Sequence, residues 1–164
     1  MAKIITFKVI DPDAQSGEWG SYEDPSCYIG LTEDSNDIDY IMRGDDIVIN
    51  KPDIRVVFSY PLEKKHIITL VPTNGQKVFT RKELARVIVL KYQEIYAEED
   101  ESTEIIPETH ANKNLRENGL HAGLLNRVTT NGKWGVWGHS LDDLLLHTVR
   151  YVEEEDLYTL GIDS

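Results

Sequence analysis

The sequence has a single cysteine, Cys27, and this excludes an internal disulfide framework. No apolar run approaches the ~20 residues that a membrane-spanning helix needs. The opening segment MAKIITFKVI is too short and too regularly alternating for a signal peptide. The sequence also lacks an Asn-x-Ser/Thr glycosylation acceptor. These absences predict an intracellular, cytoplasmic protein that does not enter a membrane.

Positive charge is scarce in this chain. Its 17 Lys and Arg residues stand against 29 Asp and Glu residues, which gives a formal net charge of −12. A field of this sign repels phosphate backbones, whose nonspecific binding depends on positive charge. We therefore expect no nucleic-acid partner. A basic protein surface or a divalent cation fits the charge better. The expected partner is a protein, basic in character, or a second copy of the chain.

Motifs that would name a reaction are also missing. The sequence contains no phosphate-binding loop, no dinucleotide-binding fingerprint, no HExxH pair and no CxxC pair. It therefore predicts no cofactor and gives no support to nucleotide chemistry. The segment from Asp11 to Glu18 has the oxygen-rich start of a calcium loop, but Ser16 stands where such a loop needs glycine. We interpret this segment as a solvated acidic turn.

The residues that are present favour one α+β domain over 1–164. Hydrophobic residues make up 40% of the chain, enough for a single core at this length. Thr80 and Glu83 form a capping box that predicts the start of a helix. Apolar residues follow at three- and four-residue spacing, so the helix is amphipathic and should extend from 80 to about 97. The acidic run Glu98–Glu101 opposes the helix dipole and should fray the end.

Alternating and β-branched segments predict an antiparallel sheet on which this helix packs. The Asn74-Gly75 pair is typical of a tight turn, so residues 46–79 are interpreted as a β-meander. A C-terminal β-hairpin is predicted around the acidic turn Glu153–Asp156. The expected strands before the long helix are Ile4–Ile10, Cys27–Leu31, Asp46–Asn50, Arg55–Tyr60, His66–Val71 and Lys77–Phe79.

Two further segments are defined by their turn-forming residues. Residues 101–123 are polar, lack sustained periodicity and are expected to form a mobile loop. Residues 128–136 carry Asn131-Gly132 between two short β-prone runs, which predicts a tight hairpin. Ser140 with Asp143 has the pattern of a helix N-cap.

A resemblance links the long helix to the segment that follows. The two stretches are FTRKELARVIVLKYQEIYAEEDEST and LNRVTTNGKWGVWGHSLDDLLLHTVRY, which together span about residues 79–151. They resemble a small family of uncharacterised proteins of giant DNA viruses and some protists, and the Trp-Gly-His block is the specific part. The resemblance implies no activity or catalytic residue. The family has Asp and Gly where this chain has Ser140 and Asp142, which argues against a mechanism through Ser140.

The candidate binding residues are Trp134, Trp137 and His139. The two tryptophans lie three residues apart in a glycine-rich segment, so in an ideal strand they face opposite sides and one is exposed. An exposed tryptophan beside polar groups is a common binding anchor. The sequence's other clustered aromatic residues, Trp19, Tyr22 and Tyr28, are interpreted as core.

The alternative is a metal-dependent hydrolase. His139, Asp143 and His147 are spaced i, i+4, i+8 and would share a face if one helix carried them. His110 and His121 are further weak candidates for metal ligands. Against this, the alternation over 147–152 predicts a strand, and no recognised zinc motif is present. The leading hypothesis is therefore a non-catalytic, acidic protein-interaction or structural module.

Overall fold

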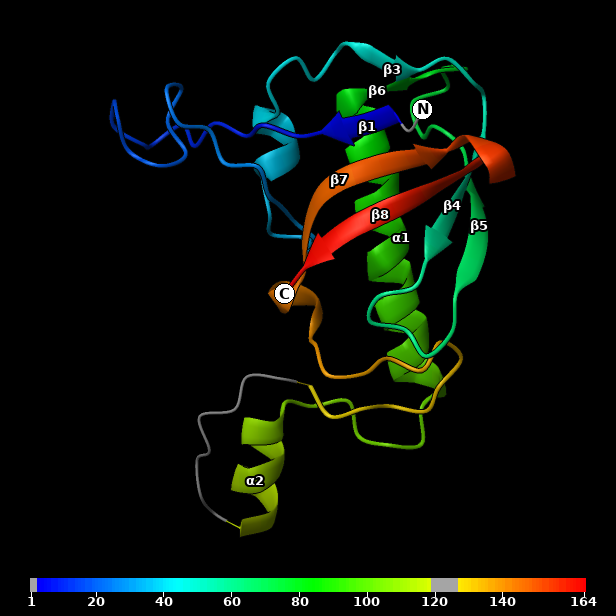
Figure 1. Cartoon of the computed structure of the whole chain (residues 1–164). Helices are drawn as coiled ribbons and strands as arrows, with labels where there is room; N and C mark the ends of the chain where they lie inside the picture. The colour runs from blue at the N-terminus through cyan, green and yellow to red at the C-terminus, as the bar shows by residue number, and fades with distance from the viewer. Residues whose placement is uncertain (1–2, 119–126) are drawn as a thin grey trace.

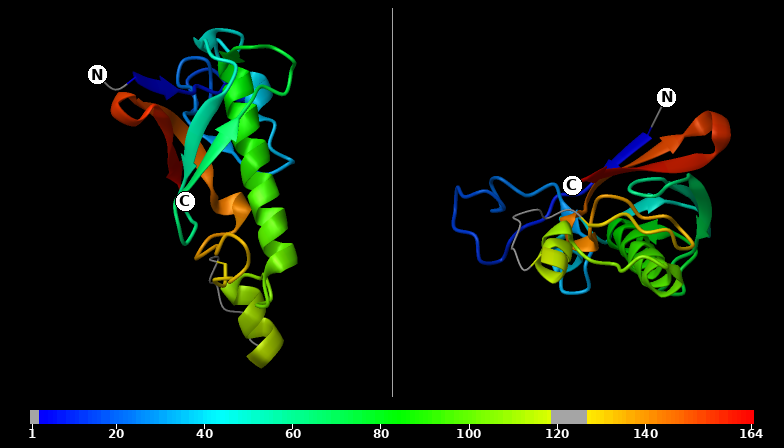
Figure 2. Two further views of the ribbon diagram at one scale, coloured as in Figure 1. Left: turned by 90° about the vertical axis from the view of Figure 1, so that its right-hand side faces the viewer. Right: turned by 90° about the horizontal axis from the view of Figure 1, so that it is seen from below.

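The computed structural model describes residues 3–118 and 127–164, and it confirms the α+β class. A six-stranded sheet and a smaller two-stranded sheet accompany one long helix, α1 (Arg81–Ser102). The larger sheet lies along one side of α1, with β7 (Leu145–Val152) and β8 (Leu157–Asp163) crossing it (Figures 1 and 2). The apolar core fills the space between these two layers.

The main sheet has the strand order β1-β7-β8-β4-β5, and β2 also pairs with β7. The β7–β8 pair is the predicted C-terminal hairpin, with Val149 opposite Leu160 and Tyr151 opposite Tyr158. Its turn is a short helical segment, η3 (Glu153–Glu155). The other strands of this sheet are β1 (Lys3–Thr6), β2 (Ile29–Gly30), β4 (Ile54–Phe58) and β5 (His66–Leu70).

The predicted β-meander over 46–79 is wrong. The β4–β5 hairpin forms as expected, but β3 (Ile47–Ile49) leaves it and pairs with β6 (Phe79–Thr80) in a separate sheet. Strand β4 instead takes β8 as its other neighbour, and this pair is parallel. Ile49 of β3 and Phe79 of β6 are both buried in the apolar core, and this burial favours the separate pairing.

Helix α1 starts where the sequence predicted and ends later. The Thr80 hydroxyl accepts the backbone N–H of Glu83 at 3.2 Å, which is half of the expected capping box. The other half is absent, because the Glu83 carboxylate accepts the N–H and O–H of Thr73 instead. The helix continues through the acidic run to Ser102, five residues beyond Ala97. Its apolar face is buried as predicted, and includes Leu84, Val87, Ile88, Tyr92, Ile95 and Tyr96.

A second helix, α2 (His110–Asn118), lies within the stretch that was expected to be an irregular loop. It sits beyond the end of α1, away from the sheet (Figure 1). An isolated bridge between Thr109 and Arg127 and an ion pair between Arg116 and Glu108 hold its start. The expected mobility of 101–123 stays a prediction, and its last residues lie outside the described ones.

Candidate functional site

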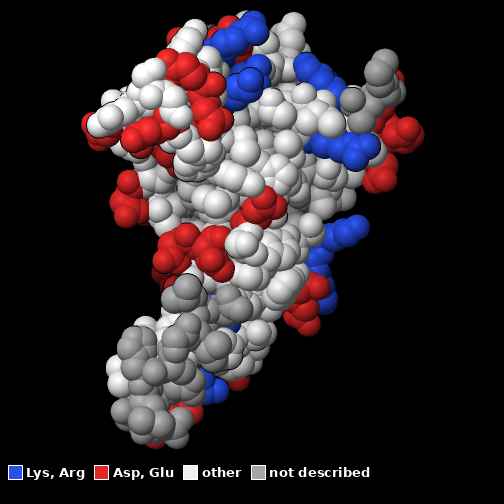
Figure 3. Space-filling view, turned by 60° about the vertical axis from the view of Figure 1, so that its left-hand side comes forward, with Lys and Arg blue, Asp and Glu red and all other residues white. Residues whose placement is uncertain are grey.

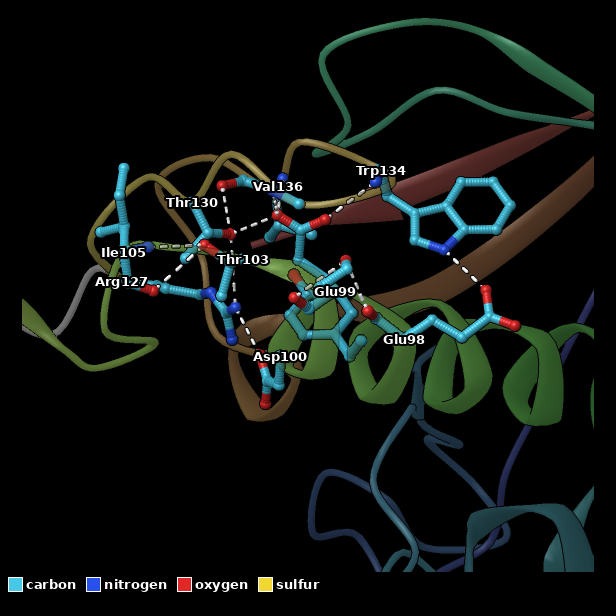
Figure 4. A network of polar contacts seen from close by, with 12 residues as sticks. Glu98, Glu99, Asp100, Thr103, Ile105, Arg127, Thr130, Trp134 and Val136 are labelled. Atoms are coloured by element: carbon cyan, nitrogen blue, oxygen red, sulfur yellow. Dashed lines mark hydrogen bonds and ion pairs between the residues drawn. The ribbon is translucent and has the colours of Figure 1, made fainter.

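The segment 127–138 does not form the predicted tight hairpin. It is a loop that encloses the carboxylate of Glu99, a fully buried residue near the end of α1 (Figure 4). One oxygen, Oε1, accepts the backbone N–H of Trp134 at 2.8 Å and of Gly135 at 3.0 Å. The other, Oε2, accepts the Thr130 hydroxyl at 2.6 Å and the Gly132 N–H at 2.8 Å. The buried carboxylate thus sets the path of the loop.

Two glycines make this close approach possible. A Cβ on Gly132 would lie 2.7 Å from Glu99 Oε1 and 2.8 Å from the Glu99 carbonyl oxygen, closer than real contacts allow. Gly135 has a φ of 67°, which favours glycine. The Asn131-Gly132 pair therefore allows the loop to approach the Glu99 carboxylate, although its sequence is typical of a hairpin turn.

The neighbours of Glu99 also have partners, and the expected fraying of this helix end is wrong. Glu98 accepts hydrogen bonds from Lys133 Nζ and from the indole N–H of Trp134, both at 2.9 Å. Asp100 pairs at 2.6 Å with Arg127, whose guanidinium lies over the Tyr96 ring. These contacts offset the unfavourable helix dipole.

Burial acts to raise the pKa of Glu99, but its hydrogen bonds outweigh burial. The donors are the Thr130 hydroxyl and the backbone N–H groups of Trp134, Gly132 and Gly135, and together they hold the pKa below its ordinary value. Glu99 is therefore a carboxylate at neutral pH, buried and fully used in holding the loop.

The two candidate tryptophans differ in exposure, although neither lies in a strand. Trp134 is half-buried, with its ring against His66 at 4.7 Å and its N–H on Glu98. Trp137 is 40% exposed, and its ring meets the edges of Tyr60 and His139. Trp134 is thus committed to the fold, and Trp137 presents part of its indole to solvent.

His139 is held from both sides of its ring. Its Nδ1 lies 2.6 Å from an oxygen of Asp143, and its Nε2 lies 2.8 Å from the hydroxyl of Tyr60. Its carbonyl oxygen accepts the hydroxyl of Tyr96 at 2.8 Å. These bonds tie the Trp-Gly-His turn to α1 and to the end of β4. The expected side-chain cap by Ser140 is absent.

Of the candidate set, the structure joins His139 to Asp143 but groups no third described candidate with them. Asp143 ends a short helical turn, η2 (Leu141–Asp143), and His147 lies in strand β7, so no single helix carries the i, i+4, i+8 set. His147 instead contacts Asp163 and the ring of Tyr28. His110 begins α2, and His121 lies outside the described residues. Among the residues that the structure describes, no three His, Cys, Asp or Glu side chains are grouped for a metal ion.

A cavity lies elsewhere, where the segment 11–28 folds back on Val9 and Ile10. Its volume is about 440 Å³, within the range of small ligand sites. Backbone hydrogen bonds from Asp11 to Gly20 and from Ser26 to Val9 close the loop around it. We call it the aromatic–acidic hollow, because its walls include Trp19, Tyr28, Tyr40, Asp11, Asp13 and Asp37.

The interpretation of Trp19 and Tyr22 as core residues was wrong. Trp19 is 65% exposed and Tyr22 is 71% exposed. Of the two, only Trp19 lines the hollow. Both stand in a stretch of turn formers without apolar periodicity, and this was the available signal that they would not reach a core.

The charged residues that line the hollow are all acidic. Three aspartates line it, and none of its described lining residues is Lys or Arg. Figure 3 shows Asp and Glu atoms gathered on the left and centre of the face that carries this loop. Carboxylates and the faces of aromatic rings both attract cations. The hollow can therefore receive an ammonium or guanidinium group.

Comparisons with known proteins add no identity. No family model, no curated protein and no solved structure matches this chain. Within residues 3–118 and 127–164, no helix is both long and apolar enough to cross a membrane.

Proposed function

We propose that this protein is a non-catalytic interaction module that binds a basic segment of a protein partner through the aromatic–acidic hollow. The carrying observation is that three aromatic residues and three aspartates line one cavity of about 440 Å³. An aromatic wall contributes desolvated contact area, and the carboxylates select for positive charge. The net charge of −12 would speed the encounter with such a partner.

Trp137 is a second anchor for the same partner. His147 connects the wall of the hollow to the last strand, because it contacts the Tyr28 ring at 6.1 Å between ring centroids and an oxygen of Asp163 at 3.4 Å. The next residue, Ser164, contacts the Tyr60 hydroxyl at 2.8 Å, and Tyr60 packs against Trp137. A partner that fills the hollow can therefore continue along this chain of contacts to Trp137. Trp134 has no such role, because its indole N–H is used within the fold.

An intracellular setting is part of the proposal. Cys27 is exposed and the chain has no second cysteine, which suits a reducing compartment. The resemblance of residues 79–151 to proteins of giant DNA viruses and protists suggests basic proteins of such a virus or its host as the first partners to test.

The test replaces Trp19, one of the residues that line the hollow. Trp19→Ala should weaken binding of Lys- and Arg-containing synthetic peptides about tenfold, because a central aromatic anchor is lost. Its free energy of unfolding should stay within about 0.5 kcal/mol, since the indole is mostly exposed. Fluorescence anisotropy with labelled peptides, at two salt concentrations, measures the affinity and its electrostatic share.

Tyr22→Ala is the matched control, because Tyr22 is an exposed aromatic residue of the same loop that does not line the hollow. It should bind as the parent protein does. If Trp19→Ala binds normally and only Trp137→Ala weakens binding, the hollow is not the site. Equal binding of an acidic peptide of the same length would contradict the proposed class of partner.

A further inference from the structure

A second cavity, which we call the basic pocket, adjoins the aromatic–acidic hollow. It has a volume of about 260 Å³ and is lined by Thr6, Lys8, Met42, Arg43 and Arg81. Three cations thus meet at one cavity in a chain that has only 17 and carries a net charge of −12. Such a grouping attracts an anion locally against the field of the whole protein.

The two cavities share one piece of backbone. Residues 8–10 and 40–42 form a short antiparallel ribbon, in which Val9 bridges Ile41. The Ile10 N–H donates to the Tyr40 carbonyl at 3.1 Å, and the Met42 N–H donates to the Lys8 carbonyl at 2.7 Å. Lys8 therefore lies opposite Met42 in the basic pocket, and residue 10 lies opposite Tyr40 in the hollow.

Alternation places both pairs on the outer face of this ribbon. Val9 and Ile41 are each only 5% exposed and point into the core. Their neighbours Lys8 and Tyr40 are exposed, as strand geometry requires for residues on the other face. The two cavities are thus about two residues apart, or roughly 7 Å at the rise of a strand.

The cations of the basic pocket differ in their existing partners. Arg43 pairs with Asp46 at 2.7 Å, and Arg81 donates to the carbonyl of Thr6 at 2.5 Å. Within the described part of the chain, Lys8 Nζ has no hydrogen bond or ion pair. Lys8 is therefore the group most ready to receive a carboxylate from outside.

We propose that the basic pocket binds an acidic side chain of the same partner that occupies the hollow. This inference rests on the proposed function and adds the partner's pattern to it. A partner strand that places Lys or Arg in the hollow presents its next same-face residue two positions away, at the spacing of the basic pocket. Charge complementarity at both cavities then selects an extended segment with a basic and an acidic residue at i and i+2.

The test compares synthetic peptides that differ only in charge pattern. The parent probes are acetylated, amidated peptides containing Lys-Ser-Glu or its reverse, Glu-Ser-Lys, in a Thr-rich extended context. In one of these two orders, the peptide should bind up to about fivefold more tightly than its Glu→Gln form, as expected for an exposed ion pair. The order Lys-Glu-Ser, which turns the acid to the other face, should lose this advantage.

Lys8→Gln should abolish the advantage of the acidic residue while leaving the Lys-Ser-Gln peptide bound as before. Lys64→Gln, at an exposed lysine in the β4–β5 turn, is the matched control and should keep it. If Glu and Gln peptides bind the parent protein equally, the basic pocket has no such role and the proposed function stands. If no lysine peptide binds and Trp19→Ala changes nothing, both proposals fail.

Discussion

Replacing Glu99 with glutamine should lower the free energy of unfolding by roughly 3 kcal/mol, the scale expected when a buried charged acceptor is lost. The carboxylate accepts four backbone N–H groups and one hydroxyl, from Thr130, Gly132, Trp134, Gly135 and Val136. An amide of the same size keeps one acceptor oxygen and turns two N–H donors toward the others. Several buried donors would then lack partners in a protein of ordinary marginal stability.

Urea unfolding followed by circular dichroism measures this loss. Glu101→Gln is the matched control, because Glu101 is exposed on the same turn of α1 and should change stability by less than about 0.5 kcal/mol. Hydrogen exchange gives an independent readout, since the amides of Gly132, Trp134 and Gly135 should lose protection first. A Glu99→Gln variant as stable as the control would show that the carboxylate does not hold the loop.

The Glu99 network also explains how the C-terminal turn is placed. The segment 127–138 leads directly to His139, whose carbonyl oxygen is held by Tyr96 one turn before Glu99 on α1. His139 then holds Tyr60, and Tyr60 supports Trp137. Loss of the buried carboxylate should therefore reach the exposed indole through these contacts. The aromatic–acidic hollow, built on the N-terminal loop, should be less affected.

The parts of the fold that the sequence predicts are those decided by near neighbours. The start of α1 follows from Thr80 and from apolar spacing within the helix, and both act over a few residues. The β7–β8 hairpin follows from alternation on either side of the turn at 153–156. Each prediction needs no knowledge of where the rest of the chain lies.

The parts that were missed depend on distant partners. The parallel β4–β8 pair joins Val56 to Tyr158, about one hundred residues away, and local pattern carries no sign of it. The Asn131-Gly132 pair does not form the predicted hairpin, because Glu99, more than thirty residues earlier, is buried against it. The hollow needs Trp19 and Tyr40 on one cavity, which only the folded ribbon of 8–10 and 40–42 provides.

Acid should unfold this protein through its two buried glutamates, which lie near opposite ends of α1. Glu83 and Glu99 are both fully buried, and burial alone would raise their pKa values. The hydrogen bonds of Thr73 and the ion pair with Arg86 outweigh burial at Glu83, as the loop donors do at Glu99. Both pKa values are therefore held below the ordinary 4.5.

A depressed pKa in the folded state means that the unfolded chain binds protons first as pH falls. The stabilisation is thus fully present above about pH 4.5 and is lost as pH falls through the folded pKa values. The free energy of unfolding from these two groups should be flat between pH 7 and pH 5, and should drop below that. Urea titrations at intervals from pH 7 to pH 3 measure the curve.

Glu99→Gln separates the contribution of this one group from general acid effects. The free energy of unfolding of the variant should be lower than that of the parent at pH 7. It should fall less below pH 4.5, since one fewer proton is taken up on unfolding. Glu101→Gln is the exposed control, and its free energy of unfolding should follow the parent curve. If the free energy of unfolding fell equally below pH 4.5 in Glu99→Gln and in the parent, the five donors would not stabilise the Glu99 carboxylate. The path of the loop around it would then need another cause.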